Sequence, residues 1–464
     1  MSSLQRIDVI VAGSGIAGIT AAKAARENGA ETLLVGRLAE SNTLLSGACF
    51  RTRGTPGSTL NESVARTGRR LSDEALVEEF CANAEKRVGE TLEGIETIEI
   101  PFGVKPAHKQ ALLEKLEADA RQNHRAEGRV ARLLVEDETV QGAIIEHGNA
   151  VFEVNAPAVI IATGGYASLF AKSNGFPQAC GSGIAAALGA GAVVRDLEFV
   201  LYHPFGGRPT DSLAGFNVFV DGKRDYETEE TLDSHNAHHL LPELCRKFEG
   251  RQVLLKKADE TIVAGTTVHS TLGGIAIGVN GRTSLQGLYA CGEAAGGLHG
   301  ASRLGGAALS AAVVFAANAG TAAARESAAT KTAKQMRKVH DCCGTDYAAE
   351  MRQALSYCTR TVLTPECIAK TKRAVAKATR NARRMPCAHC RHKVSHSLLL
   401  AQAFAHAADA RHESRGTFFR RDFAEESELA QSTFFKTHGG MLQTVLSRPS
   451  STPCKPFKTI APEL

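Results

Sequence analysis

A strand–turn–helix–strand pattern at the start of the chain constrains its fold more than any other feature. One apolar run ends at Val11, and a second, Thr32–Val35, follows a helical stretch. Between them, Gly13, Gly15 and Gly18 form GxGxxG at the strand-to-helix turn. Such glycines permit the tight turn, the approach of a pyrophosphate and close helix packing, while the helix N-terminus faces the phosphate charge. The alternative is a glycine-rich turn in an unliganded α/β domain. We favour a βαβ unit that binds a dinucleotide through Gly13, Ser14, Gly15, Ala17 and Gly18.

Composition and charge limit the classes of protein that the chain can be. Its 464 residues suffice for two or three domains, and 43% apolar residues with 44 glycines suit an α/β protein. The net charge of +5 is mild, with no basic stripe interleaved with aromatics, so we expect no nucleic-acid partner. The longest apolar stretch, Ala307–Ala317, is too short for a transmembrane segment. A strand begins too early for a secretory signal, which favours the cytoplasm and implies that the 12 cysteines are thiols.

Hydrophobic periodicity predicts the elements that follow. Amphipathic helices are expected over 72–96, with Ser72 as the N-cap, and over 107–127. A small-residue helix is expected over 183–193, and strands over 130–136, 140–146, 150–154 and 158–162. Residues 207–260 are polar and charged, as in an inserted module, and from about 325 the pattern is helical and basic.

Several later stretches, taken in order with the opening one, resemble a known family. They are SNTLLSG at Ser41–Gly47, VIIATGG at Val159–Gly165, GSG at Gly181–Gly183, DLEFVLYHP at Asp196–Pro204, VHSTLGGI at Val268–Ile275, GLYACGEAAGGLHGASRLGGAAL at Gly287–Leu309 and RHESRGTFFRRD at Arg411–Asp422. This order and spacing resemble the flavoprotein family of fumarate reductase, succinate dehydrogenase and L-aspartate oxidase. The resemblance implies redox chemistry on FAD rather than on a nicotinamide.

The residues themselves agree with FAD. An NAD-binding unit usually has an acid about 20 residues past its first glycine, where this chain has Gly36-Arg37. The resemblance implies that Arg37 lies near the FAD adenosine end, and that Ser41 and Thr43 offer hydroxyls to the pyrophosphate. The alternative for these two hydroxyls is an ordinary loop role. Where some family members attach FAD through a histidine, this chain has Asn42, so we expect noncovalent FAD.

The resemblance also assigns residues to the rest of the cofactor. Glu293 would accept hydrogen bonds from the ribityl hydroxyls, although an acid there could instead cap the following helix. Ala308 and Leu309 would present backbone amides to the flavin ring, where donors stabilise negative charge. The remaining FAD-binding positions that the resemblance implies are Gly47, Ala162, Thr163 and Gly164.

On the substrate side, His203, His269 and Arg303 match the carboxylate-binding residues of the family. A guanidinium grips a carboxylate through two parallel hydrogen bonds, and histidines add further donors. Taken singly, a histidine is more often a core or solvated residue, and the alternative for Arg303 is a salt bridge between domains.

The expected capping domain departs from the family pattern. Only 65 residues separate His203 from His269, and Ser212–Tyr226 replaces the usual cap motif. Arg224 and Arg246 are the available cap arginines, but neither lies in a matching motif, so both are interpreted as surface charges. The proton donor of the family is therefore unassigned in this chain.

Two further features have simple interpretations. Cys387 and Cys390 form a single CxxC near His392 and His396, which favours reduced thiols over a metal or iron–sulfur site; no metal is expected. The basic run from Lys372 to Lys393 suits a solvated helix face or a docking surface for an acidic partner. Glu413 and Arg415 are expected to fasten the last domain by ion pairs, although the resemblance allows them to shape the substrate cleft.

Together these patterns predict an α/β fold: a Rossmann-like FAD-binding domain with an inserted small α+β capping domain and a helical C-terminal domain. The expected boundaries are 1–205 and 270–325 for the FAD domain, 206–269 for the cap and 326–464 for the C-terminal domain. The predicted activity is hydride transfer between FAD and a small carboxylic acid such as fumarate, succinate or L-aspartate. The alternative is an electron-transfer subunit without dicarboxylate turnover. An iron–sulfur or quinone electron partner is expected. The protein itself is expected in the cytoplasm or, through that partner, at the inner membrane face.

Overall fold

A parallel five-stranded sheet contains the predicted nucleotide unit. The computed structural model describes residues 6–206, 216–233, 241–258, 260–329, 336–341, 348–450 and 457–460. The strand order is β19 (Leu288–Ala290), β10 (Ala158–Ile161), β1 (Val9–Ala12), β2 (Thr32–Val35) and β6 (His124–Ala126). The chain passes from β1 to β2 on one side and later places β10 on the other, so the strand order reverses at β1. In such sheets a ligand binds beyond the carboxyl ends of the strands at this reversal.

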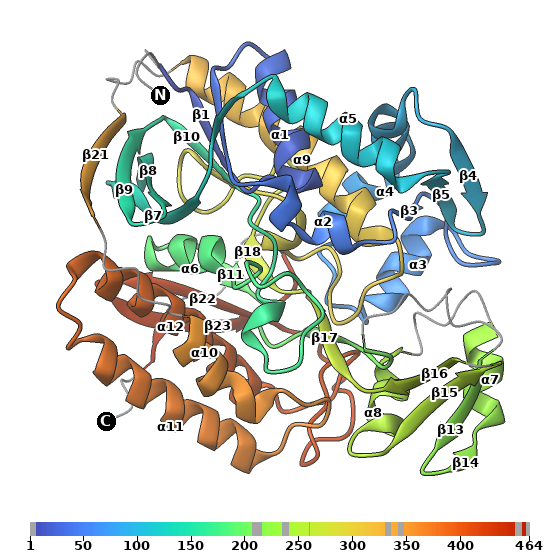
Figure 1. The fold of residues 1–464 in the computed structure, drawn as a ribbon. Coiled ribbons are helices and arrows are strands. Elements are labelled where there is room, and N and C mark those ends of the chain that lie inside the picture. The colour runs from blue at the N-terminus through green and yellow to red at the C-terminus, as the bar shows by residue number, and fades with distance from the viewer. Residues whose placement is uncertain are drawn as a thin grey trace.

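Helices cover one face of this sheet (Figure 1). They include α1 (Ile16–Glu27), α5 (Lys109–Arg121) and α9 (Ala307–Ala328). Small residues let α1 and α9 pack closely: a Cβ on Gly320 would lie 2.2 Å from the Ala21 carbonyl oxygen. By length and composition α9 could cross a membrane, but 78% of its most apolar window is buried in the protein. The expected domain boundary at residue 325 falls inside this helix.

Most of the elements predicted from periodicity are present, with one correction at a helix start. The helix α4 (Glu74–Leu92) is capped by Asp73, whose side chain accepts from the Ala75 N–H, so the prediction of Ser72 as N-cap was wrong. The predicted strands are confirmed as β7 (Arg129–Glu136), β8 (Thr139–His147) and β9 (Ala150–Asn155), which pair with β21 (Met336–Asp341). The small-residue helix is α6 (Ser182–Gly189), shorter than expected because the chain turns into β11 (Val194–Arg195).

The C-terminal region contains the expected helices and also strands that periodicity did not reveal. The helices are α10 (Ala348–Leu355), α11 (Pro365–Ala382) and α12 (Ala388–Ala410). The strands β22 (Ser432–His438), β23 (Met441–Ser447) and β24 (Lys458–Thr459) continue a sheet begun by β20 (Ala295–Gly296), β18 (Gly274–Ala276) and β11. The C-terminal strands therefore share a sheet with strands from residues 194–296.

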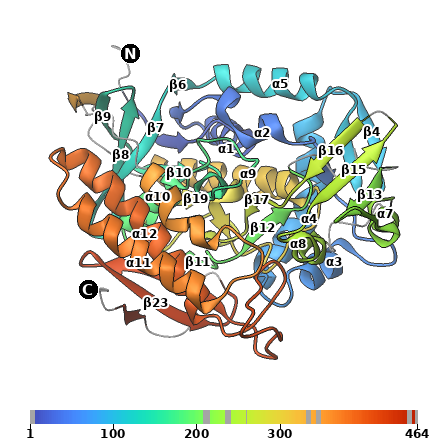
Figure 2. The ribbon, with the colours of Figure 1, turned by 60° about the horizontal axis from the view of Figure 1, so that its bottom comes forward.

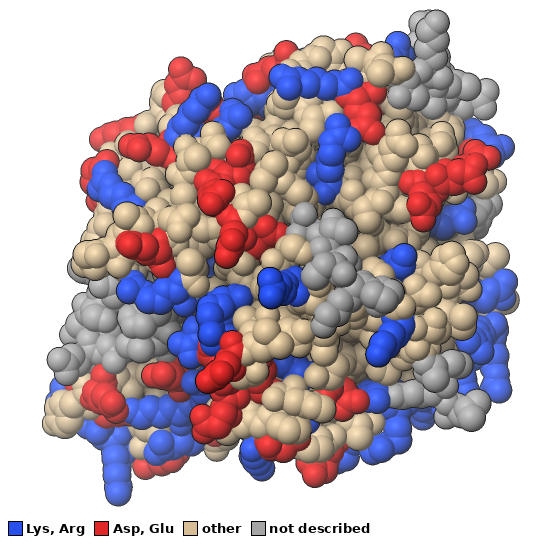
Figure 3. Space-filling model, turned by 180° about the vertical axis from the view of Figure 1, so that it is seen from behind, with Lys and Arg blue, Asp and Glu red and all other residues tan. Residues whose placement is uncertain are grey.

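Buried ion pairs fasten this shared sheet. Arg411 pairs with Glu198 at 2.6 Å and with Glu413 at 2.7 Å. Arg415 also pairs with Glu413 and donates to the Arg69 carbonyl at 2.8 Å, so these contacts fasten the C-terminal region to earlier parts of the chain. Elsewhere, acidic and basic side chains are interspersed over the face seen from behind (Figure 3), as the mild net charge suggests.

A small lobe is inserted along the chain between β12 and β17 and lies at one edge of the molecule (Figure 2). Its four-stranded antiparallel sheet consists of β13 (Asn217–Val220), β14 (Lys223–Arg224), β15 (Val253–Lys257) and β16 (Glu260–Ala264). The lobe has an apolar cluster of its own, separate from the main core. Its helices are α7 (Tyr226–Asp233) and α8 (Leu241–Phe248). An antiparallel ribbon of β12 (Val200–His203) and β17 (Thr267–Thr271) leads into and out of the lobe. The remaining elements are α2 (Asn42–Leu45), α3 (Leu60–Thr67), β3 (Phe50–Arg51), β4 (Thr97–Ile100) and β5 (Gly103–Pro106).

Candidate cofactor and carboxylate site

A cavity of about 1000 Å³ begins at the glycine turn after β1 and extends to the β12–β17 ribbon. This volume is at the upper end of the range for small-molecule and cofactor sites. Every residue singled out from the sequence for FAD or carboxylate binding lines it, apart from Gly18. Sequence positions as distant as Gly13 and Arg303 therefore meet around one space.

The three glycines of the turn have different physical roles. Gly13 has a φ of +110°, and a Cβ there would lie 2.2 Å from the Ala162 carbonyl oxygen. A Cβ on Gly18 would lie 1.8 Å from the Gly13 carbonyl oxygen, so both glycines are required for backbone packing. A Cβ on Gly15 would meet only side chains, with Thr43 Oγ1 at 3.2 Å. Gly15 is thus the glycine that keeps the cavity open at the N-terminus of α1.

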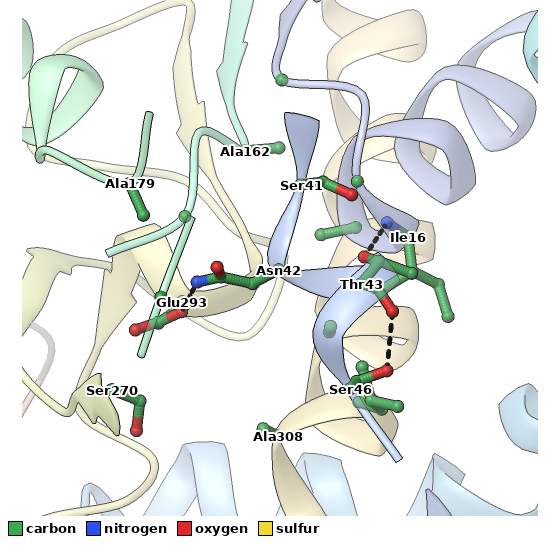
Figure 4. Close-up of a pocket in the computed structure, with 18 of the residues that line it drawn as sticks. Ile16, Ser41, Asn42, Thr43, Ser46, Ala162, Ala179, Ser270, Glu293 and Ala308 are labelled. Atoms are coloured by element: carbon green, nitrogen blue, oxygen red, sulfur yellow. Dashed lines mark hydrogen bonds between the residues drawn. The ribbon is translucent and has the colours of Figure 1, made fainter. Parts of the chain in front are cut away.

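Hydroxyl groups surround this end of the cavity. Thr43 Oγ1 accepts from the Ile16 N–H at 2.9 Å (Figure 4). The Ser41 hydroxyl donates to the Leu38 carbonyl at 2.7 Å. Among the described residues, Ser14 Oγ and Thr163 Oγ1 are buried without a hydrogen-bond partner. Buried hydroxyls normally have partners, so these two are suited to a polar ligand such as a pyrophosphate.

Arg37 lines the cavity but also forms ion pairs. Its guanidinium binds Glu127 and lies 3.7 Å from Glu40. The hydrogen bond to Glu127 raises the pKa of Arg37. If Arg37 contacts an adenosine, its guanidinium would do so while still paired with these carboxylates. The sequence had not indicated Glu127 as a partner.

Glu293 lies in the middle of the cavity, in the turn Gly292–Ala294 after β19. Its carboxylate accepts from the Thr271 N–H at 2.9 Å and from the Asn42 side-chain amide at 3.5 Å (Figure 4). Asn42 in turn accepts from the Phe176 N–H at 2.8 Å. Burial raises the pKa of Glu293, although these hydrogen bonds oppose the shift. Asn42 therefore joins three loops around the cavity.

The N-terminus of α9 faces the same space. Gly306 caps the helix in the left-handed region, with φ of +77°, and Ala308 and Leu309 follow in the first turn. Backbone N–H groups in a first turn lack intrahelical acceptors and favour negative charge nearby. This arrangement is suited to a ligand group that gains electrons, and Gly47, Ala162 and Gly164 also line the cavity.

The two site histidines come from the ribbon that leads to the small lobe. The ribbon register shifts between Leu201 and Tyr202, which leaves His269 as an extra residue on β17. Such bulges re-aim side chains and are common beside active sites. The ring centroids of His203 and His269 are 5.7 Å apart, and both residues line the cavity.

Each histidine receives a hydrogen bond on Nδ1. The Phe205 N–H donates to His203 Nδ1 at 3.2 Å, and the Asn174 side-chain nitrogen lies 3.2 Å from His269 Nδ1. A neutral imidazole that accepts at Nδ1 carries its proton on Nε2. Both rings can therefore act as Nε2–H donors. Asn174 was missed in the sequence because a single loop asparagine carries no motif.

Arg303 also lines the cavity, where its charge acts on Glu293 and His299. Its Nη1 donates to the Leu304 carbonyl at 3.4 Å, and Nε has no hydrogen-bond partner among the described residues. Burial lowers the pKa of Arg303, and the Glu293 carboxylate opposes the shift. Burial and the charge of Arg303 also lower the pKa of His299 to about 3, so that ring is neutral. A buried guanidinium with free donors is suited to an anionic ligand.

The described part of the small lobe contributes no residue to the cavity lining. Arg224 pairs with Glu229 at the surface, and Arg246 lies over the Phe419 ring, 5.1 Å from its centroid. Of the segment 212–226 that stands in place of the family's cap motif, residues 212–215 lie outside the described residues.

The CxxC segment has a different role in the described structure. Cys387 caps α12 by accepting from the Cys390 N–H, and Cys390 is buried. The intervening His389 binds Glu146 on β8. Within the described ranges, no three His, Cys, Asp or Glu side chains are grouped as a metal ion would need.

Comparison with protein families gives two matches along the chain. The model of the FAD-binding domain matches residues 8–93, 97–224 and 217–309. The model of the fumarate reductase flavoprotein C-terminal region matches residues 376–444. Together these matches span both the cavity and the shared C-terminal sheet.

Individual relatives agree with these matches. The chain is 30% identical to an L-aspartate oxidase of Caulobacter vibrioides over 67% of this chain and 66% of that protein. It is 25% identical to that of Pyrococcus horikoshii, over 93% of this chain and 99% of that one. It is 26% identical to the fumarate reductase flavoprotein subunit of Haemophilus influenzae, over 71% and 70%. The chain spans 66%, 62% and 47% of three L-aspartate oxidases that it matches.

Solved structures have the same fold. A mutated FrdA chain of E. coli quinol fumarate reductase superimposes with a TM-score of 0.82 at 21% identity, covering 97% of both chains. The Mycobacterium smegmatis Sdh1 complex with UQ1 gives 0.75 at 20% identity, covering 97% of this chain and 95% of that one.

Proposed function

The chain belongs to the FAD-binding flavoprotein family of fumarate reductase and L-aspartate oxidase, and we propose that it is an FAD-dependent oxidoreductase acting on a small carboxylic acid. The observation that carries this proposal is that His203, His269 and Arg303 line the same cavity as the glycine turn, with the two imidazole centroids 5.7 Å apart. A family match alone would support FAD binding but no substrate class.

The carboxylate is proposed because all three side chains present donors. Both histidines accept at Nδ1, so a neutral ring carries its proton on Nε2, and Arg303 Nε has no hydrogen-bond partner among the described residues. Hydrogen bonds to charged groups contribute about 1.5–3 kcal/mol each. The three donors would bind the carboxylate and orient the adjoining carbon, so that the reacting atoms meet in line.

The cofactor is FAD, which accepts or donates a hydride when bound. Gly15, Ser14 and Thr163 would hold its pyrophosphate, and the first turn of α9 would face its ring. Asn42 cannot form the covalent bond that a histidine forms, which supports noncovalent attachment.

L-aspartate, fumarate and succinate are the candidate substrates. The L-aspartate oxidase relatives and Asn42 favour aspartate, and the fumarate reductase relative keeps the dicarboxylates in consideration. Electrons would pass to oxygen, a quinone or an iron–sulfur partner. A second candidate is an electron-transfer subunit, favoured because the described part of the small lobe gives the cavity no proton donor.

One anaerobic experiment separates these functions. L-aspartate should bleach the oxidised flavin if the protein is an aspartate oxidase, and fumarate should reoxidise the dithionite-reduced flavin if it is a fumarate reductase. Arg303→Ala should retain FAD and slow either reaction more than a hundredfold, because charged hydrogen bonds are lost. Arg303→Lys is the matched control for charge, and should restore only part of the rate. Unchanged turnover in Arg303→Ala would overturn the assignment, and flavin inert to every carboxylic acid would favour the electron-transfer subunit.

A further inference from the structure

Two cysteines of the C-terminal region lie side by side without forming a sequence motif. The sulfur atoms of Cys358 and Cys367 are 4.0 Å apart. Cys358 ends the 3₁₀ turn Ser356–Cys358, and Cys367 lies in the first turn of α11. Cys358 is 1% exposed and Cys367 is 6% exposed, beneath the exposed Pro365 and Glu366. Neither residue lines the cavity described above.

The surroundings of Cys367 stabilise a thiolate. Its sulfur accepts from the Thr364 N–H at 3.2 Å, and it lies at the positive end of an 18-residue helix. The hydrogen bond from Cys358 lowers the pKa of Cys367 to about 6, and the same contact raises the pKa of Cys358. Cys367 is therefore the stronger nucleophile of the two, although its sulfur also lies 3.1 Å from the Thr364 carbonyl oxygen, to which the thiol form donates. A thiolate next to a second thiol is the arrangement of cysteines that respond to oxidants.

We propose that Cys358 and Cys367 form an oxidation site at which hydrogen peroxide converts the dithiol to a disulfide. The Cys367 sulfur attacks one peroxide oxygen and the O–O bond breaks, which gives a sulfenic acid and hydroxide. The Cys358 sulfur then attacks the sulfenic sulfur, the S–O bond breaks, and the hydroxyl leaves as water with the remaining proton. In total, two thiols lose two electrons and two protons, and one peroxide becomes two water molecules.

The segment after Cys358 connects this pair to the carboxylate site. Tyr202, which precedes His203 on β12, donates from its hydroxyl to the Arg360 carbonyl at 2.9 Å. The Val362 N–H donates to Glu249, just after α8, at 2.9 Å. Closing the disulfide shortens the sulfur separation from 4.0 Å to about 2.05 Å, which draws Cys358 toward α11. We expect this movement to loosen the Tyr202 contact and the position of His203.

Mass spectrometry tests the oxidation site on the full-length protein. After reduction, removal of reductant and treatment with a few equivalents of hydrogen peroxide, the protein should lose two hydrogens and yield a peptide that joins Cys358 to Cys367. In Cys358→Ser, dimedone should label Cys367, and in Cys367→Ser the same dose should leave Cys358 as a thiol. A Cys387→Ser/Cys390→Ser double variant is the control and should form the disulfide normally. The proposal would be overturned if both cysteines were still free thiols after peroxide treatment, or if dimedone labelled Cys358 rather than Cys367. Thermal melts check that each variant is folded.

A binding measurement tests the link to the carboxylate site, which rests on the proposed function. The oxidised protein should bind succinate several-fold more weakly than the reduced protein, and dithiothreitol should restore the affinity. The Cys358→Ser/Cys367→Ser variant should not respond to peroxide. An unchanged dissociation constant for succinate in the disulfide form would overturn the link. If the reduced protein bound no carboxylate, that result would count against the proposed function but not against the oxidation site.

Discussion

Single hydrogen bonds on Nδ1 determine which proton each site histidine offers. The donor to His203 is a backbone N–H, which substitution does not remove, but the donor to His269 is the side chain of Asn174. Asn174 lines the cavity and bonds to the His269 ring, so we regard it as a positioning residue for that ring.

Asn174→Ala should therefore weaken succinate binding without releasing FAD. Loss of one hydrogen bond of about 1 kcal/mol corresponds to roughly a five-fold higher dissociation constant, measured through the flavin spectrum. Nitrogen NMR should show His269 Nδ1 losing its hydrogen bond, a signal that a merely structural defect would not produce. Asn83→Ala on α4 is the matched control, since Asn83 bonds only within its own helix. A variant with unaltered His269 resonances would remove Asn174 from this role.

At the scale of elements, two glycines of the turn between β1 and α1 have different roles: we expect Gly18 to be needed for folding and Gly15 for cofactor binding. Gly18→Ala should destabilise the protein by about 3 kcal/mol or more, because its Cβ would overlap the Gly13 carbonyl. Gly15→Val should stay folded, since Gly15 has φ of −76° and its Cβ would meet only side chains, but its side chain would occupy the pyrophosphate end. Thermal melts and the flavin content of purified protein measure the two effects. A Gly15→Val protein with full flavin would contradict this division.

The contact between β8 and α12 predicts a pH dependence of stability. Burial alone would raise the pKa of Glu146, but hydrogen bonds from His389 and Lys393 and the charge of Arg129 hold it at about 2. A carboxyl whose pKa is lower in the folded than in the unfolded protein stabilises the fold. This contribution is complete at pH values above the unfolded pKa of 4.5 and is lost as the pH falls toward the folded pKa of about 2. The contribution is about 3 kcal/mol, from the linkage between pKa and stability.

Urea unfolding between pH 7 and pH 3 measures this contribution. Glu146→Gln should be less stable at pH 7, because Lys393 is left buried without its carboxylate, and its stability should vary less between pH 4.5 and pH 3. The exposed Glu90, which pairs with Arg87, is the control: Glu90→Gln should change stability by less than about 1 kcal/mol. Equal pH profiles for Glu146→Gln and the unsubstituted protein would contradict the role of this contact.

At the scale of the whole molecule, the sequence predicts what local patterns encode. The parallel strands, the glycine turn and the strands β7 to β9 follow from period and turn chemistry, and the family motifs brought His203, His269 and Arg303 to one cavity. Long-range pairing has no such signal: β22 pairs with β11, more than 200 residues earlier in the chain, and β23 then pairs with β22. The helical, basic pattern before these strands gave no sign of them. Asn174, Glu127 and the Cys358–Cys367 pair were missed for the same reason, because only the fold brings their partners near.

The central claim is that this cavity holds one noncovalent FAD from the glycine turn to the carboxylate clamp. Acid precipitation of the purified protein, followed by measurement of flavin in the supernatant and pellet, tests it directly. We predict about one FAD per chain, all of it in the supernatant, and none in protein carrying Gly15→Val. Protein that is colourless and takes up no FAD from excess cofactor, or flavin that remains in the pellet, would contradict the claim.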